Sequence, residues 1–294
     1  MKRRLVKDGS TMEETTDSNA LAPLAVAVVQ LCSNQDVDAN LDTACRFIHE
    51  AAEAGARVVA TPENTAFLRT DPSAPAPKQG LDGPIVSRLR AAARDAGVWL
   101  LIGSIQERVP GETHRYANTS VVIDGTSPDA PITCTYRKLH LFDIDIKGGE
   151  SQKESDWIVR GDEVICTPVA GVQTGLTICY DLRFPALYQT LQDRGARILT
   201  VPAAFTEFTG KDHWLPLLRA RAIENQCFVI AANQSGHHGG KRRSYGKSTI
   251  IDPWGITLAV APDGPGWVMA RLDFAQQDRI RAALPCHAHR HPNV

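Results

Sequence analysis

From Leu24 onward, short runs rich in Val and Ile alternate with longer amphipathic segments, and this alternation constrains the fold more than any other feature of the sequence. The run at 24–31 predicts a buried strand, the segment 39–56 predicts an amphipathic helix, and the run at 57–63 predicts a second strand. Further helices are expected at 82–97, 185–194, 212–225 and 274–283. Helices that alternate with buried strands are typical of layered α/β proteins.

Two neighbouring strands lack a helix between them. NTSVVID (118–124) and ITCTYRK (132–138) are separated only by a turn-rich segment, which predicts a mixed sheet with some antiparallel pairing. Strands without helices also suggest that a second sheet covers one face of the first. Other strands are expected at 98–105, 172–179, 196–203, 227–234, 248–253, 256–261 and 266–273.

No internal repeat or linker divides the chain, so we expect a single domain over 23–285. Residues 1–22 are interpreted as a disordered N-terminal extension, because basic residues there are not followed by an apolar segment. Residues 286–294 are interpreted as a C-terminal tail. No apolar run reaches the roughly 20 residues that a membrane span needs, so a soluble protein is expected.

The composition indicates which kind of binding partner and which cellular compartment to expect. The 32 basic and 33 acidic side chains give a net charge of −1, which argues against nucleic acid or an anionic membrane and favours a small molecule. Seven cysteines are an odd number and form no CxxC pair. A disulfide framework and a zinc ribbon are therefore disfavoured, and a reducing cytoplasm is expected.

Three predicted strands end in residues able to do chemistry. They are Glu63 after RVVATP, Lys138 after ITCTYR, and Cys179 after VQTGLTI. In open α/β sheets the ligand crevice lies beyond the carboxyl ends of the strands. Each residue alone is more often structural, but the set of three favours a catalytic site.

The chemistry of such a site follows from the three side chains. A helix N-terminus and the Lys138 ammonium would stabilise a Cys179 thiolate. Glu63 would take the thiol proton and return it to a departing amine. The backbone N–H of Tyr180 and Lys138 would hold the oxyanion formed when the thiol attacks an amide carbonyl. This scheme needs neither a metal nor an organic cofactor.

The same residues carry a resemblance to the nitrilase superfamily of carbon–nitrogen hydrolases, from Leu24 to about Pro285. The blocks that carry it are TPEN, YRKLHLFD, CYDLRFP, GARILTVPAAFTEFTG, HWLPLLRARAIENQCFVIAANQ and SYGKSTIIDPWG. The resemblance implies that Glu63 is the general base, Lys138 the cation that stabilises the oxyanion, and Cys179 the nucleophile.

It also implies a four-layer αββα sandwich, homodimers or higher homo-oligomers, and a second glutamate after the lysine. Glu154 best matches that glutamate, and Glu150 is the competing candidate. Its implied role is to orient Lys138 and the attacking water.

Within the superfamily, YRKLHLFDIDI, CYDLRFPALY and HWLPLLRARAIE most resemble the deaminated glutathione amidases and ω-amidases. The implied reaction is removal of an amide from a small 2-oxo acid. An N-carbamoyl amidohydrolase, a nitrilase and a non-enzymatic partner-binding protein are the alternatives. Lys247 and Leu215 depart from residues common in relatives, which affects the expected pocket rim and not the triad.

Other residues are expected around the substrate. Phe205 and Thr206 are candidates for substrate contacts, and Arg183 either binds a substrate carboxylate or, more in keeping with its neighbours, braces Asp181 or Glu224. The basic loop 237–247 either rims the pocket or is simply solvated. The tail CHAHRHP (286–292) has zinc-binding residue types, but its place at the chain end favours a surface or dimer-contact role.

Overall fold

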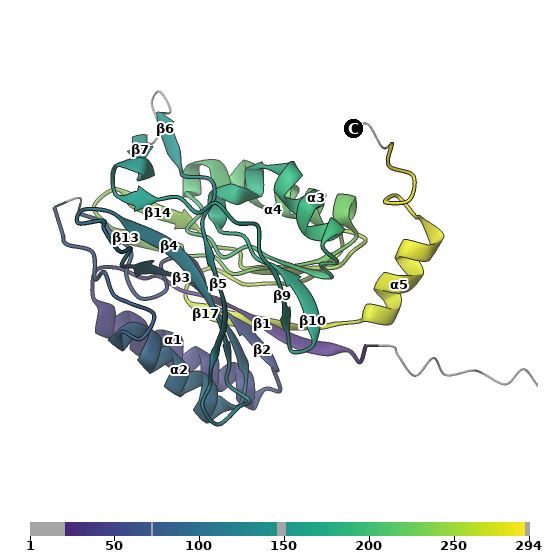
Figure 1. The fold of residues 1–294 in the computed structure, drawn as a ribbon, viewed down its shortest axis with the longest axis horizontal. Coiled ribbons are helices and arrows are strands. Elements are labelled where there is room, and N and C mark those ends of the chain that lie inside the picture. Colours follow the sequence, from purple (N-terminus) through teal and green to yellow (C-terminus); the bar gives the residue numbers. More distant parts are fainter. Residues whose placement is uncertain (1–20, 72, 146–150, 292–294) are drawn as a thin grey trace, which may run out of the picture.

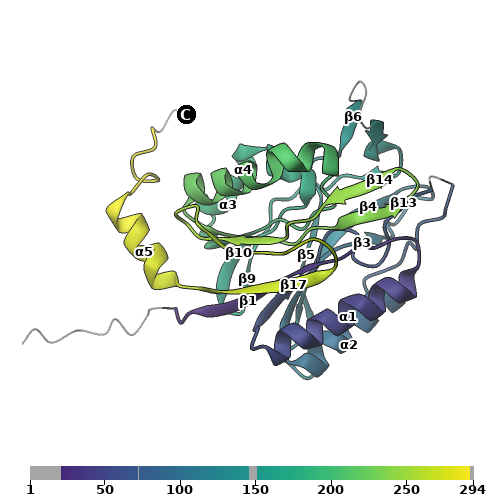
Figure 2. The same ribbon diagram turned by 180° about the vertical axis from the view of Figure 1, so that it is seen from behind.

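The computed structural model describes residues 21–71, 73–145 and 151–291, in which two β-sheets pack face to face between two pairs of helices (Figure 1). Helices α1 (Val37–Glu53) and α2 (Pro84–Ala96) cover the first sheet, and α3 (Pro185–Asp193) and α4 (Glu207–Asn225) cover the second. The reverse view in Figure 2 gives the same order of layers. This arrangement is the predicted four-layer αββα sandwich.

The first sheet has seven strands and mixed pairing. Its central strands β1, β2 and β3 are parallel, and β17, β4 and β5 add antiparallel pairs. The prediction of a mixed sheet is therefore confirmed. In spatial order the strands are β17 (Gly266–Leu272), β1 (Leu24–Gln30), β2 (Val58–Ala60), β3 (Trp99–Glu107), β4 (Tyr116–Asp124) and β5 (Ile132–Arg137), with β8 (Ile158–Val159) beside β4.

The second sheet has six strands, of which β10, β11 and β12 are parallel. In spatial order the strands are β16 (Thr257–Val260), β15 (Thr249–Ile251), β12 (Phe228–Ala231), β11 (Ile198–Thr200), β10 (Val172–Gly175) and β9 (Cys166–Val169). The sequence did not predict β9. It pairs with β10 across a turn at Ala170 and Gly171, both of which have positive φ.

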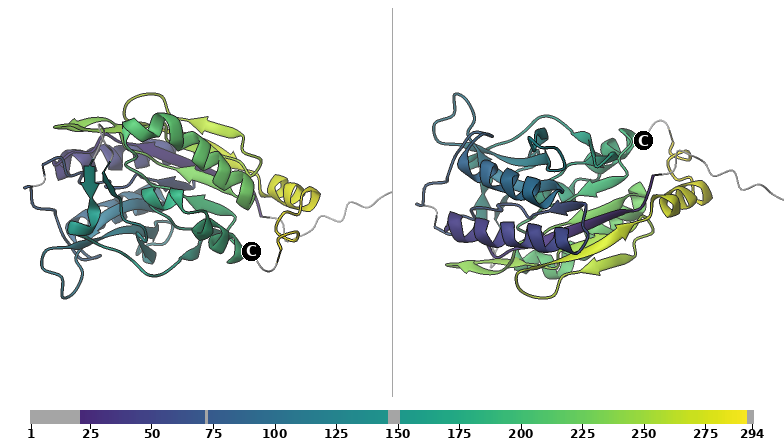
Figure 3. Two further views of the ribbon diagram at one scale, coloured as in Figure 1. Left: turned by 90° about the horizontal axis from the view of Figure 1, so that it is seen from above. Right: turned by 90° about the horizontal axis from the view of Figure 1, so that it is seen from below.

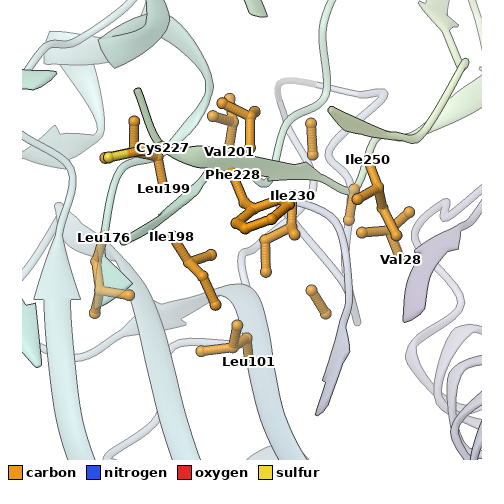
Figure 4. Packing of buried hydrophobic residues seen from close by; sticks show 14 of the residues in the cluster. Val28, Leu101, Leu176, Ile198, Leu199, Val201, Cys227, Phe228, Ile230 and Ile250 are labelled. Carbon is orange, nitrogen blue, oxygen red and sulfur yellow. The ribbon is translucent and has the colours of Figure 1, made fainter. Parts of the chain in front are cut away.

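The alternation of side chains in β1 shows why its sequence is apolar throughout. Val26 and Val28 face the core between the sheets, whereas Ala27 and Val29 belong to the core beneath α1 and α2. Figure 4 shows Val28 in the inter-sheet core with residues of both sheets, among them Leu101 and Phe228. A strand buried on both faces has no solvent side, and therefore shows no polar alternation.

Two segments that lie outside the predicted strands and helices contain regular structure. The stretch 142–162 holds β6 (Asp143–Asp145), β7 (Ser151–Lys153), the 3₁₀ turn η1 (Glu154–Asp156) and β8. The basic stretch 237–247 lies largely in a hairpin of β13 (Ser235–Gly239) and β14 (Arg242–Tyr245). Both hairpins are two-stranded and local, so their short strands lack the long apolar runs on which the prediction relied.

Helix α4 begins at Glu207, five residues before the predicted start. Gly210 lies inside the helix because a Cβ there would come within 2.3 Å of the Tyr245 Cβ. The glycine thus serves close packing against β14 and is not a helix stop. The last helix, α5 (Phe274–Ala283), matches its prediction and extends beyond the end of the sandwich (Figure 3). None of the helices in the described residues is both long and apolar enough to span a bilayer.

Candidate active site

The three chemically reactive strand ends come from both sheets and meet in one place. Glu63 follows β2, Lys138 follows β5 directly, and Cys179 begins the 3₁₀ turn η2 (Cys179–Arg183) after β10. Glu63 and Cys179 line the same small cavity. The Lys138 ammonium lies 3.0 Å from Glu63 Oε1.

Lys138 is held between two carboxylates. Its Nζ also contacts both oxygens of Glu154, at 3.0 and 2.9 Å. Lys138 is 1% exposed and Glu63 2% exposed. Of the two candidate glutamates, Glu154 is thus in contact with Lys138, while Glu150 lies outside the described residues. The Phe142 N–H donates to Glu154 Oε2 at 2.8 Å and helps to fix that carboxylate.

Backbone and side-chain donors fix Glu63. The Ala204 N–H donates to its Oε2 and the Asn118 Nδ2 donates to its Oε1, both at 2.8 Å. Asn118 lies within β4, and its carbonyl accepts the N–H of Lys138 at 3.0 Å. The pairing of β4 with β5 thus brings Asn118 to the site. Sequence analysis missed this residue because a polar side chain in mid-strand gives no signal of its own.

Burial and neighbouring charges set the protonation of the cluster. Burial opposes ionisation of Glu63, but the Lys138 ammonium, together with hydrogen bonds from Cys179 and the Ala204 N–H, holds the Glu63 pKa below its usual value. Burial likewise disfavours the Lys138 ammonium, but Glu154 and Glu63 raise its pKa well above the usual value. At neutral pH both Glu63 and Lys138 are therefore charged.

The Cys179 thiol behaves differently from the prediction. Burial and the nearby Glu63 carboxylate raise its pKa well above the usual value, and Lys138 opposes this shift without reversing it. The expected thiolate is thus wrong for the free protein. Burial is the main cause, and the charges add to it, because one ammonium is shared between two carboxylates and the cluster presents net negative charge to the sulfur. A neutral thiol beside an ionised carboxylate needs a proton transfer before attack.

Lys138 is expected to be necessary for stability as well as chemistry. Replacing it with Met leaves two buried carboxylates facing each other without a cation, so the free energy of unfolding should fall by about 3–5 kcal/mol at neutral pH. Urea denaturation followed by circular dichroism measures this change. Lys211→Met is the matched control, because Lys211 is exposed on α4 and lies 3.9 Å from Asp212. Equal stability of the two variants would contradict the electrostatic description of the cluster.

The backbone at Cys179 is constrained. Its φ is +50°, a left-handed conformation that is unfavourable for residues other than glycine. The Cys179 N–H donates to the Pro202 carbonyl at 2.8 Å, and the Asp181 N–H donates to Ile178. Among the described residues the N–H of Tyr180 has no acceptor. It is therefore the available backbone donor beside the sulfur.

The Asp181 side chain fixes the η2 turn through hydrogen bonds. Its buried carboxylate accepts hydrogen bonds from the Ile178 N–H at 2.8 Å and the Tyr136 hydroxyl at 2.7 Å. It also accepts from the backbone N–H of His140 at 3.0 Å. With its oxygens occupied in this way, Asp181 does not pair with Arg183.

The predicted brace for Arg183 is wrong for both proposed partners, because Arg221 binds Glu224 at 2.7 Å. Arg183 instead approaches His213 Nδ1 at 3.3 Å and lies over the rings of Tyr180 and Phe205. Its guanidinium is within reach of the small cavity beside Cys179. The cavity is lined by Glu63, Phe142, Gln152, Glu154, Cys179, Tyr180, Arg183, Ala204, Phe205, Thr206, Thr209 and Arg242, so every predicted site residue except Lys138 reaches its wall.

Other candidates lie away from this cavity. Lys247 pairs with Asp263 at 2.6 Å and lines neither of the cavities at the site. In the tail, His287 approaches the carbonyl of Asn225 at 3.1 Å. Within the described residues, no group of three or more His, Cys, Asp or Glu side chains is arranged to hold a metal ion.

Comparisons with known proteins agree with this fold. Residues 25–282 match the carbon-nitrogen hydrolase family. The deaminated glutathione amidase of Bos taurus is 40% identical over 92% of this chain and 82% of its own. The crystal structure of the Caenorhabditis elegans NitFhit protein is 35% identical, with a TM-score of 0.85 over 92% of this chain and 66% of that one. The structure of Saccharomyces cerevisiae Nit3, a nitrilase superfamily member, is 28% identical, with a TM-score of 0.78 over 90% of this chain and 96% of that one. The chain therefore belongs to the carbon–nitrogen hydrolase family of enzymes.

Proposed function

We propose that this enzyme hydrolyses an amide of a small 2-oxo acid through a thioester on Cys179, with deaminated glutathione as its substrate. The observation that carries the proposal is the buried cluster in which Lys138 binds Glu63 and Glu154 beside the cavity that Cys179 lines. The substrate is supported by relatives named deaminated glutathione amidase, which are 36–40% identical to this chain.

In the first step Glu63 accepts the proton of the Cys179 thiol while the sulfur attacks the amide carbonyl carbon. Because the Glu63 pKa lies below its usual value and the Cys179 pKa above it, the proton rests on sulfur in the free enzyme, and its transfer to Glu63 is uphill and is coupled to formation of the carbon–sulfur bond. The negative charge that develops on the carbonyl oxygen faces the Lys138 ammonium and the Tyr180 N–H. Both are donors in a buried site, where such stabilisation is strongest.

In the second step the proton on Glu63 passes to the amide nitrogen, the carbon–nitrogen bond breaks, and the acyl group remains on sulfur. Glu63, again a carboxylate, then takes a proton from a water molecule that attacks the thioester. The carbon–sulfur bond breaks and the thiol regains its proton. Glu154 keeps Lys138 in place during both halves of the reaction, through contacts to both of its oxygens.

Arg183, Phe205 and Thr206 are proposed to bind the acyl half. They line the cavity beside Cys179, and within the described residues Arg183 has no carboxylate partner. A guanidinium without a carboxylate suits the carboxylate of a 2-oxo acid. The aromatic rings of Tyr180 and Phe205 lie against the guanidinium and limit its access to water.

A substrate panel tests the proposal. The purified enzyme is given deaminated glutathione, 2-oxoglutaramate, an N-carbamoyl amino acid and a nitrile, and the released acid is measured. We expect the highest kcat/KM for deaminated glutathione. A preference for 2-oxoglutaramate would make the enzyme an ω-amidase, and a preference for the N-carbamoyl compound or the nitrile would contradict the 2-oxo amide proposal altogether.

We further propose a homodimer or higher homo-oligomer in the cytoplasm. Ile223 of α4 lies next to Gly255 in the turn that holds Trp254, and this turn leads into the edge strand β16, so these elements offer an apolar surface. Its exposed apolar residues are Ile223, Trp254, Ile256, Leu258 and Val260. All seven cysteines are free, which fits a reducing compartment. Analytical ultracentrifugation reports the assembly, and a monomer at micromolar concentration would contradict it.

A further inference from the structure

We propose that a second, larger cavity beside the active site binds the departing half of the substrate, and that this half is a peptide-like amine bearing a carboxylate. The inference rests on the proposed function and deepens it. The cavity has a volume of about 410 Å³, which is far more than a molecule the size of ammonia or water occupies. It is lined by Asn64, Arg69, Thr70, Gln106, Tyr116, Asn118, Gln152, Lys153, Glu154, Trp157, Ile158, Lys241 and Arg242.

The position of this cavity matches the leaving side of the amide. It shares Gln152, Glu154 and Arg242 with the small cavity beside the sulfur, so the two are adjacent. Its wall includes Asn118, whose Nδ2 binds Glu63 Oε1 at 2.8 Å. Because Glu63 returns a proton to the departing nitrogen, that nitrogen must lie on the Glu63 side. A group attached to it then extends into the larger cavity.

Two buried amide side chains form a rigid part of the wall. Gln106 and Asn118 are each 2% exposed, and their side-chain oxygens are buried without a hydrogen-bond partner. Their orientation is fixed, because the Gln106 Nε2 donates to Asn64 Oδ1 and to the Phe67 carbonyl, and the Asn118 Nδ2 donates to Glu63. Buried acceptors without donors are rare in folded proteins. These two oxygens are covered by protein atoms, so they belong to the wall behind the cavity and do not contact its contents.

Three cationic side chains without ion-pair partners in the described part of the chain line the larger cavity. Arg69 lies over the rings of Tyr116 and Trp157 at 6.0 and 5.5 Å, and its Nε is buried without a partner. Lys241 and Arg242 come from the β13–β14 hairpin. Among the described residues, none of these three cations forms an ion pair.

The carboxylate in this lining is Glu154, and Lys138 already binds it. The cavity therefore has an excess of positive charge and suits an anion. A cationic cavity on the side of the departing nitrogen suits an amino acid or short peptide that carries a free carboxylate. Deaminated glutathione cleaved beside its 2-oxo acyl group releases such a molecule, cysteinylglycine, whereas 2-oxoglutaramate releases only ammonia.

The test compares three substrates that share the 2-oxoglutaryl acyl group and differ in the departing amine: cysteinylglycine, its C-terminal carboxamide, and ammonia. In Arg69→Met, kcat/KM for the cysteinylglycine substrate should fall about 10–100-fold, the range for loss of a charge-assisted hydrogen bond. Values for the carboxamide and for 2-oxoglutaramate should change less than about threefold. Arg242→Met is a second variant in case Arg69→Met folds poorly.

Arg271→Met is the matched control, because Arg271 is exposed on β17 and lines neither cavity. It should leave all three values unchanged. An equal loss for all three substrates in Arg69→Met, or no loss for any, would overturn the assignment while leaving amide hydrolysis intact.

If none of the three substrates is hydrolysed, the proposed function fails and a binding measurement still decides the inference. Isothermal titration of cysteinylglycine into Cys179→Ser should give binding that Arg69→Met weakens about 10-fold or more. Absence of binding to Cys179→Ser would overturn the inference.

Discussion

Replacing Cys179 with alanine is expected to lower the release of 2-oxo acid from deaminated glutathione by about 10⁴-fold or more, because no other group replaces the nucleophile. The side chain is within the small cavity, and the removed sulfur has no structural hydrogen bond beyond its contact with Glu63. The backbone conformation at φ +50° is equally available to alanine and cysteine. The fold should therefore survive, and the loss should be in turnover.

Cys45→Ala is the control for this experiment. Cys45 is a half-buried free cysteine on α1, and it lines neither cavity at the site. Its substitution should leave turnover within about twofold of the wild type, as expected for a site remote from substrate. Thermal unfolding of both variants separates loss of fold from loss of chemistry. Wild-type activity in Cys179→Ala would refute the thioester mechanism.

Replacing Glu63 with glutamine is expected to lower kcat/KM by about 10³-fold, within the range for loss of a general base. Glutamine keeps the shape of the side chain and one oxygen acceptor, but it cannot take the thiol proton. The same substitution should lower the pKa of Cys179, because the Glu63 carboxylate is among the groups that raise it. Ultraviolet titration of the thiolate, with Cys179→Ser as the blank, measures this shift.

The pH dependence of wild-type activity tests whether Glu63 must be ionised for catalysis. The Glu63 pKa lies below its usual value of 4.5, so the base is ionised across the neutral range. Activity should be lost only as the pH falls through that pKa, which places the acidic limb of kcat/KM below about pH 4.5. In Glu63→Gln this limb should disappear.

Glu107→Gln tests whether these effects are specific. Glu107 is also buried and paired with a cation, Arg137, at 2.8 Å, but it lines neither cavity. It should leave the thiol titration unchanged. If Glu63→Gln left the Cys179 pKa in place, or raised it, the electrostatic account of the cluster would be wrong.

The positions of Glu63, Lys138 and Cys179 were accessible to sequence reasoning because each ends an apolar run. Strand ends gather at one edge of a sheet, so residues far apart in the chain become neighbours there. The αββα layering followed in part from the helix-free strand pair 118–124 and 132–138, and in part from the resemblance to a family.

Other features depend on pairing that the sequence does not display. Asn118 reaches Glu63 only because β4 and β5 pair in one particular register. Arg183 lacks its expected partners because Asp181 is taken up by Tyr136 and His140, which belong to another sheet and its following loop. Which groups bind the Asp181 carboxylate depends on the three-dimensional fold and not on distance along the sequence.

The protonation of Cys179 illustrates the same limit. A lysine next to a cysteine lowers the thiol pKa when the lysine is unpaired, and the sequence alone supports that expectation. In the folded protein burial raises the thiol pKa most, and the Glu63 carboxylate adds to this shift because two carboxylates share the ammonium. Burial and the charge balance of the whole cluster, and not one neighbouring lysine, set the protonation state of the nucleophile.

The central claim is that the acyl group of the substrate passes through a covalent bond to one sulfur atom. Wild-type enzyme quenched with acid during turnover of a slow 2-oxo amide, digested and mapped by mass spectrometry, tests it directly. We predict the added mass of the acyl group on the peptide that contains Cys179, and its disappearance once the substrate is exhausted. Continued turnover with no adduct on that peptide, or an adduct on a different residue, would contradict the mechanism.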